Sequence, residues 1–150
     1  MSSATDLYQQ IILEHSRHPL HFGTLPDATH VCSADNPLCG DSFRVVLRVD
    51  GSIICEAAFE GAGCAISKAS ASLMCDAIIG QSTDDFEQRF RHFQATVTSA
   101  VDAPPLDHMG PLAAFSGLAR FPARIKCAML CWNAARSALN PYPSATDPVI

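Results

Sequence analysis

The chain has 150 residues, of which 48% are hydrophobic and 17% are charged, and its formal net charge is −5. This composition excludes a disordered chain and predicts a single folded domain over residues 1–150. The acidic balance argues against nucleic acid as a partner, because neutralising phosphate requires clustered lysine and arginine.

The first residues lack a basic segment followed by an apolar run and a cleavage site, so no secretory signal is predicted. Nowhere does the sequence approach the roughly 18 consecutive apolar residues of a membrane helix. We therefore expect a cytoplasmic protein with no membrane partner, in which thiols stay reduced. In that setting seven cysteines indicate metal binding or thiol chemistry more than a set of disulfides.

The first third of the chain predicts one helix and three strands. Apolar residues at helical spacing predict a helix over residues 3–16, and prolines and a glycine then end it. Residues 29–35 are typical of a short strand, and alternating residues over 42–49 predict a half-buried second strand. The turn sequence Asp-Gly-Ser leads into a third strand over 53–63, so we expect an antiparallel meander.

The remainder of the chain is predicted to be helical. Helices are expected over residues 64–80, 83–100 and 122–139, with a short helix over 112–119 and a loose tail over 140–150. Strands followed by helices indicate an α+β domain, in which several helices pack on a three-stranded antiparallel sheet.

Two of these helices have predicted inward faces. In the helix over 83–100 we expect Phe86, Phe90, Phe93 and Val97 to be buried. In the helix over 122–139 the expected stripe is Ile125, Ala128, Met129, Trp132 and Leu139.

Three cysteines stand at element boundaries. Cys39 lies in the loop "NPLCGDS" between the first two strands, Cys64 follows "FEGAG" at a helix start, and Cys127 lies near the start of the last helix. Asp41 shares the loop with Cys39. Three thiolates and a carboxylate match tetrahedral zinc, and soft thiolates also suit iron–sulfur clusters. We therefore predict a metal site where the sheet edge meets the helices.

Other interpretations of these residues stay open. Cys32, Cys55 and Cys75 lie inside predicted strands or a helix, where cysteine usually acts as a small core residue. Cys131 is one turn beyond Cys127 and is equally consistent with the core or with a spare thiol near the site. Asp41 follows a glycine, so it could be a simple turn residue.

Four segments together resemble the iron–sulfur cluster assembly scaffold family of the IscU, NifU N-terminal and SufU type. They are "LYQQIILEHSRHP", "NPLCGD", "FEGAGCAISKASASLMCD" and "PARIKCAMLCW", and the similarity extends from about Leu7 to Leu139. The chain looks more like the SufU branch, because the segment between Cys64 and Cys127 is long. In addition, Lys126 stands where IscU proteins have histidine, and "FPARIK" replaces their "LPPVK" sequence.

The resemblance implies a SufE/NifU-like fold and a zinc site made of Cys39, Asp41, Cys64 and Cys127. It also implies a SufS-like cysteine desulfurase as the sulfur donor and downstream SUF scaffold proteins as recipients. We expect Cys39 to be the acceptor of persulfide sulfur, because a loop flanked by glycine moves more easily than a helix start. Arg124 is the expected supporting basic group, and Lys126 is more typical of a solvated helix-end lysine.

On this interpretation the protein is a zinc-dependent sulfurtransferase of iron–sulfur cluster biogenesis. Two alternatives remain from the sequence. The same cysteines could assemble a [2Fe–2S] cluster or bind Fe²⁺ in a non-enzymatic scaffold, or the zinc could be purely structural.

Overall fold

The computed structural model describes residues 3–38, 40–98, 107–116 and 118–140. Its elements, in chain order, are α1 (Ser3–Arg17), β1 (His30–Asn36), β2 (Asp41–Asp50), β3 (Ile53–Ala62), α2 (Ala65–Ile78), α3 (Thr83–Thr98), η1 (Asp107–Phe115), η2 (Leu118–Arg120) and α4 (Pro122–Leu139). Predictions on Cys39, on residues 99–106 and on the tail from residue 141 lie outside the described residues, and the single domain stays a prediction.

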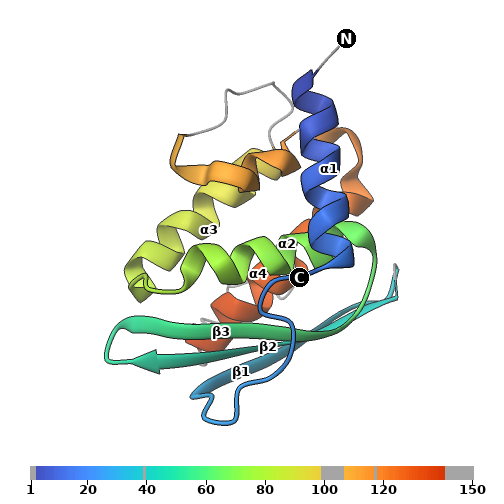
Figure 1. Cartoon of the computed structure of the whole chain (residues 1–150). Coiled ribbons are helices and arrows are strands. Elements are labelled where there is room, and N and C mark those ends of the chain that lie inside the picture. Colours follow the sequence, from blue (N-terminus) through green and yellow to red (C-terminus); the bar gives the residue numbers. More distant parts are fainter. Residues whose placement is uncertain (1–2, 39, 99–106, 117, 141–150) are drawn as a thin grey trace.

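The three strands form an antiparallel sheet in the order β1-β2-β3, which confirms the predicted meander. Figure 1 shows the helices gathered over one face of this sheet, with α2 and α4 nearest to it. The α+β prediction is therefore confirmed. None of the described helices is long and apolar enough to cross a membrane.

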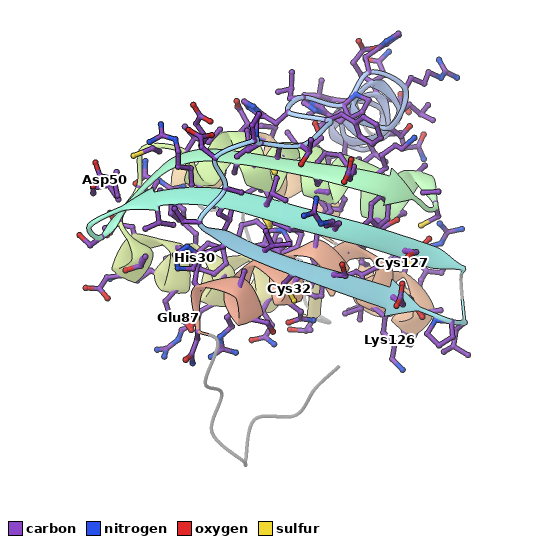
Figure 2. The ribbon with its side chains drawn as sticks, turned by 90° about the horizontal axis from the view of Figure 1, so that it is seen from below. His30, Cys32, Asp50, Glu87, Lys126 and Cys127 are labelled. Atoms are coloured by element: carbon purple, nitrogen blue, oxygen red, sulfur yellow. The ribbon has the colours of Figure 1, made fainter. Side chains whose placement is uncertain are left out.

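The opposite face of the sheet carries cross-strand charge pairs. Arg44 lies 3.2 Å from Glu60, and Arg48 lies 3.4 Å from Glu56, in each case between directly opposite residues of β2 and β3. These pairs are partly exposed, so each contributes little to the stability of the fold. Because side chains alternate along a strand, Arg44 and Arg48 point away from the buried Phe43, Val45 and Leu47, toward the face that the helices leave open and that Figure 2 views.

The helix α4 is buried on more than one side. Ala128, Met129 and Trp132 are buried as predicted, whereas Ile125 and Leu139 are only partly buried. Six consecutive residues, from Cys127 to Trp132, are buried, because α4 packs against both the sheet and α2. The single predicted stripe was too narrow for a helix enclosed in this way.

The aromatic residues of α3 pack around Trp132. Trp132 stacks on Phe93 with ring centroids 4.8 Å apart, and Phe86 and Phe90 lie at 5.9 and 6.5 Å. The predicted inward face of α3 is confirmed, and Ser82 accepts a hydrogen bond from the Asp85 N–H at the start of that helix.

The segment before α4 differs from its prediction. The expected short helix over 112–119 is replaced by the two 3₁₀ segments η1 and η2. Gly110 interrupts η1 with a φ of 54°, and Pro111 follows it. A left-handed glycine followed by a proline, which has no N–H, interrupts helical hydrogen bonding at this point.

A buried hydroxyl connects α1 to α2. Ser72 has no exposed surface, and its Oγ lies 2.8 Å from His15 Nδ1 and accepts the Leu20 N–H at 2.8 Å. Replacing Ser72 by alanine leaves both partners without this bond. We expect the free energy of unfolding to fall by about 1–3 kcal/mol.

Chemical denaturation would measure this loss. Ser16→Ala is the matched control, because the exposed Ser16 hydroxyl donates to the carbonyl of Leu13 within its own helix. Equal unfolding free energies for Ser72→Ala and Ser16→Ala would contradict the prediction.

Candidate metal centre

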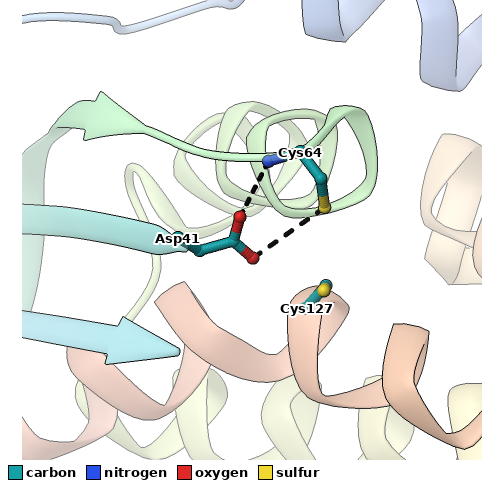
Figure 3. A group of neighbouring side chains, drawn as sticks. All are labelled: Asp41, Cys64 and Cys127. Carbon is teal, nitrogen blue, oxygen red and sulfur yellow. Dashed lines mark hydrogen bonds between the residues drawn. The ribbon is translucent and has the colours of Figure 1, made fainter. Parts of the chain in front are cut away.

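Asp41 opens β2 and is only 1% exposed. Its Oδ1 accepts the backbone N–H of Cys64 at 2.8 Å, and its Oδ2 accepts from the Cys64 thiol at 3.8 Å (Figure 3). A carboxylate at a helix N-terminus is favoured by the helix dipole and by the free N–H groups there. Asp41 is therefore more than a turn residue, because its buried carboxylate bonds to the start of α2.

Cys64 is the N-cap of α2. Its Sγ accepts the Ser67 N–H at 3.4 Å, and the Ser67 hydroxyl donates back to the Cys64 carbonyl at 3.0 Å. This arrangement orients the sulfur over the positive end of the helix, as the sequence predicted.

The chain just before Cys64 runs very close to β2. A Cβ added to Gly63 would lie 2.7 Å from Asp41 Oδ1 and 2.5 Å from the Phe43 ring. Glycine is therefore required for the backbone to bring Cys64 beside Asp41. The glycines of "FEGAG" serve this close approach.

Cys127 comes from α4 and is 3% exposed. It lies in the second turn of that helix, as expected from the sequence, and Asn36 Nδ2 of β1 donates to its Sγ at 3.9 Å. Because α4 packs against β1 and β2, the Cys127 sulfur faces Asp41 and Cys64 (Figure 3).

One ligand atom from each of Asp41, Cys64 and Cys127 lies within 4.8 Å of the other two. Donors around a tetrahedral zinc ion are separated by roughly 3.5–3.8 Å, given Zn–S bonds near 2.3 Å and Zn–O bonds near 2.0 Å. The three donors therefore fit a zinc ion after a small contraction. Two sulfurs with one carboxylate suit zinc or iron better than calcium or magnesium.

The other predicted site residues are Cys39, Arg124 and Lys126, and none of them belongs to the group of three donors found among the described residues. Cys39, the fourth predicted ligand, lies outside the described residues and stays a prediction. Arg124 and Lys126 are exposed in the first turns of α4. Figure 2 shows Lys126 beside Cys127, at the end of the sheet where β1 terminates. Their predicted roles also stay predictions.

The remaining cysteines divide into buried and partly exposed thiols. Cys75 and Cys131 are buried, and desolvation raises the pKa of each thiol well above its usual value. The core interpretation is thus confirmed for Cys75 and favoured for Cys131. Neither belongs to the group of three donors found among the described residues.

The core prediction was wrong for Cys55 and only partly right for Cys32. Cys32 lies on the edge strand β1 and is half-buried against the core. Cys55 is the extra residue of a bulge in β3, since Glu56 pairs with Arg48 and Ile54 pairs with Val49. The bulge directs Ile54 into the core and leaves Cys55 partly exposed.

Sequence reasoning missed two residues that contact the donor sulfurs. Ser67 follows Cys64 by three positions, which is the spacing of a helix cap, and that signal could have identified it. Asn36 lies opposite Asp41 in the pairing of β1 with β2. Its approach to Cys127 depends on how the helices pack, so no local pattern indicated it.

Comparison with known proteins gives consistent matches. The family model described as "NifU-like N terminal domain" matches residues 7–147. The chain is 40% identical over 128 residues to the zinc-dependent sulfurtransferase SufU of Bacillus subtilis, covering 85% of this chain and 86% of that protein. It is 36% identical over 140 residues to the iron–sulfur cluster assembly scaffold protein IscU of Streptococcus pyogenes. This match covers 93% of this chain and 87% of that protein.

A solved structure agrees with these matches. The crystal structure of a putative iron–sulfur cluster assembly scaffold protein for the SUF system, from Fervidobacterium islandicum, superimposes with a TM-score of 0.80. Its sequence is 28% identical, and the superposition covers 92% of this chain and 99% of the other.

Proposed function

Because the chain belongs to the family of NifU-like N-terminal domains, we propose that it accepts persulfide sulfur from a cysteine desulfurase at a zinc site. The ligands would be Asp41, Cys64 and Cys127 with Cys39 as the fourth. The observation that carries the proposal is the meeting of three donors from β2, α2 and α4 within 4.8 Å. The similarity to a protein named as a zinc-dependent sulfurtransferase supports zinc as the metal.

Zinc bound to cysteine keeps the thiols deprotonated, and only the thiolate is a nucleophile. The chain itself supplies the remaining requirements. Asp41 is held by the Cys64 N–H, and Cys64 is held by Ser67, so these two donors are fixed before a partner arrives. Fixed ligands confine any exchange to the remaining positions of the site.

In the transfer step, the Cys39 thiolate attacks the terminal sulfur of the desulfurase persulfide. A new sulfur–sulfur bond forms on Cys39, the original one breaks, and the desulfurase cysteine leaves as a thiolate. The exposed Arg124 and Lys126, which precede Cys127 in α4, would supply positive charge suited to an acidic partner surface or to the departing thiolate.

The test combines metal analysis with desulfurase turnover. We expect about one zinc per chain after purification without oxygen, as four-ligand sites bind one ion. Native protein should accelerate cysteine desulfurase turnover, and Cys39→Ala should return turnover to the rate of the desulfurase alone. Cys55→Ala is the matched control, because that partly exposed thiol lies at the opposite end of the sheet.

The same measurements distinguish the alternatives. Iron and acid-labile sulfide in equal amounts, with visible absorbance, would favour a [2Fe–2S] scaffold, the role named for the IscU relative. Unfolding on chelation, without any effect on a desulfurase, would favour a structural zinc. Full acceleration by Cys39→Ala would overturn the assignment of Cys39.

A further inference from the structure

Asn36 is a buried amide at the end of β1, and only 6% of its surface is exposed. Its Oδ1 accepts the Leu38 N–H at 3.2 Å, and its Nδ2 donates to Cys127 Sγ at 3.9 Å. A buried polar group is retained when its hydrogen bonds are satisfied, and both halves of this amide have partners. One half faces the loop and the other faces a donor sulfur.

The sulfurs of Cys64 and Cys127 accept hydrogen bonds from different kinds of N–H group, one from the backbone and one from a side chain. Cys64 is at a helix start, so a free backbone N–H of its own helix, that of Ser67, reaches its sulfur. Cys127 lies within α4, where its sulfur is not at a helix start and backbone N–H groups are engaged in the helical ladder. A side chain of another element, that of Asn36 in β1, donates to the Cys127 sulfur instead.

Asn36 is also connected to the second described donor. It pairs directly with Asp41 across β1 and β2, at the base of the loop that joins the two strands. The backbone that presents the Asp41 carboxylate therefore also presents the Asn36 amide. This pairing and the hydrogen bond from Asn36 to the Cys127 sulfur together connect Asp41 to Cys127, although these two residues are far apart in the sequence.

We propose that Asn36 is a positioning residue for the metal centre, whose amide N–H orients Cys127 Sγ and withdraws electron density from it. The proposal rests on the proposed function, since it requires a metal held by Cys127. Outer partners of this kind orient the ligands and tune the metal, and losing one typically weakens metal binding about 10- to 100-fold.

A purely structural role for Asn36 would act through the loop. In that case only the bond from Oδ1 to the Leu38 N–H would matter, as in an Asx turn. Asn36→Asp separates the two roles, because it keeps an oxygen for Leu38 and replaces the amide N–H by a carboxylate oxygen. Asn36→Ala removes both contacts.

The test uses Co²⁺ as a spectroscopic substitute for zinc in the intact chain. Thiolate ligands give a charge-transfer band whose energy falls when the sulfur becomes more electron-rich. We expect Asn36→Asp and Asn36→Ala both to shift this band to longer wavelength. We also expect Asn36→Ala to weaken Co²⁺ binding about tenfold or more in a chelator competition.

Ser70→Ala is the control for an indirect effect, in which a substitution changes the metal site only by weakening the packing of α4. The buried Ser70 hydroxyl donates to the carbonyl of Ala128, the residue that follows Cys127 in the chain. It should lower the unfolding free energy and leave the charge-transfer band unchanged.

Each outcome decides between the hypotheses. A band in Asn36→Asp identical to that of the native protein would overturn the proposed role of Asn36 and leave the metal site standing. A shift of equal size in Ser70→Ala would also overturn it, since the readout would then report only helix packing. Absence of any thiolate charge-transfer band in the native protein would overturn the metal site, and the role of Asn36 with it.

Discussion

Replacing Cys127 by serine is expected to weaken zinc binding by about a hundredfold or more. The binding free energy of a four-ligand zinc site is roughly 10–16 kcal/mol, so each ligand accounts for about a quarter of that. The Cys127 sulfur lies within 4.8 Å of the Asp41 and Cys64 donors. A serine hydroxyl is a poor ligand at neutral pH, so the proposed zinc site would lose one of its ligands. Competition with a chromogenic chelator measures the change.

Cys131→Ala is the matched control for this substitution. Cys131 lies one turn further along α4, is equally buried, and is absent from the group of donors among the described residues. Its replacement should leave zinc affinity unchanged. Native affinity in Cys127→Ser, or an equal loss in both variants, would show that Cys127 is not a ligand.

Gly61→Ala is expected to lower the free energy of unfolding by roughly 3–5 kcal/mol, the sum of backbone strain and overpacking. Gly61 has a φ of 132°, and an added Cβ would overlap the Ser42 carbonyl oxygen and lie 2.8 Å from the Phe43 Cα. These neighbours are backbone atoms of the central strand, so they cannot turn aside. Urea denaturation measures the loss.

Gly51→Ala separates strain from overlap. Gly51 has a φ of 63°, and no atom lies within 4 Å of an added Cβ. Its replacement costs only the left-handed backbone penalty, about 1 kcal/mol. Equal destabilisation of the two variants would show that the close approach of β3 to β2 at Gly61 is unimportant.

The Gly61 prediction concerns the site as well as stability. Residues 61 to 63 lead from β3 into α2, and their contact with β2 brings Cys64 to Asp41. If Gly61→Ala folds with a shifted α2 start, its zinc affinity should fall along with its stability. A stable variant with native zinc affinity would contradict this account of the turn.

Local patterns predicted the elements well where one rule dominated. Alternation and a turn sequence predicted β2 and β3, and Pro122 marked the first residue of α4 correctly. These sequence patterns failed to predict features that depend on how the elements pack together. The bulge at Cys55 depends on pairing with β2, and the burial of α4 depends on neighbours on several sides.

The sequence by itself determined the three strands and the four α-helices, the residue types able to bind a soft metal, and the family to which the chain belongs. These follow from short-range steric and hydrogen-bonding preferences and from motifs kept in order along the chain. Only the tertiary structure decided that Asp41, Cys64 and Cys127 meet, that Cys131 is buried, and that Asn36 reaches a donor sulfur. The physical reason is that such contacts form between β1, β2, α2 and α4, whose relative positions are set by burying a common core.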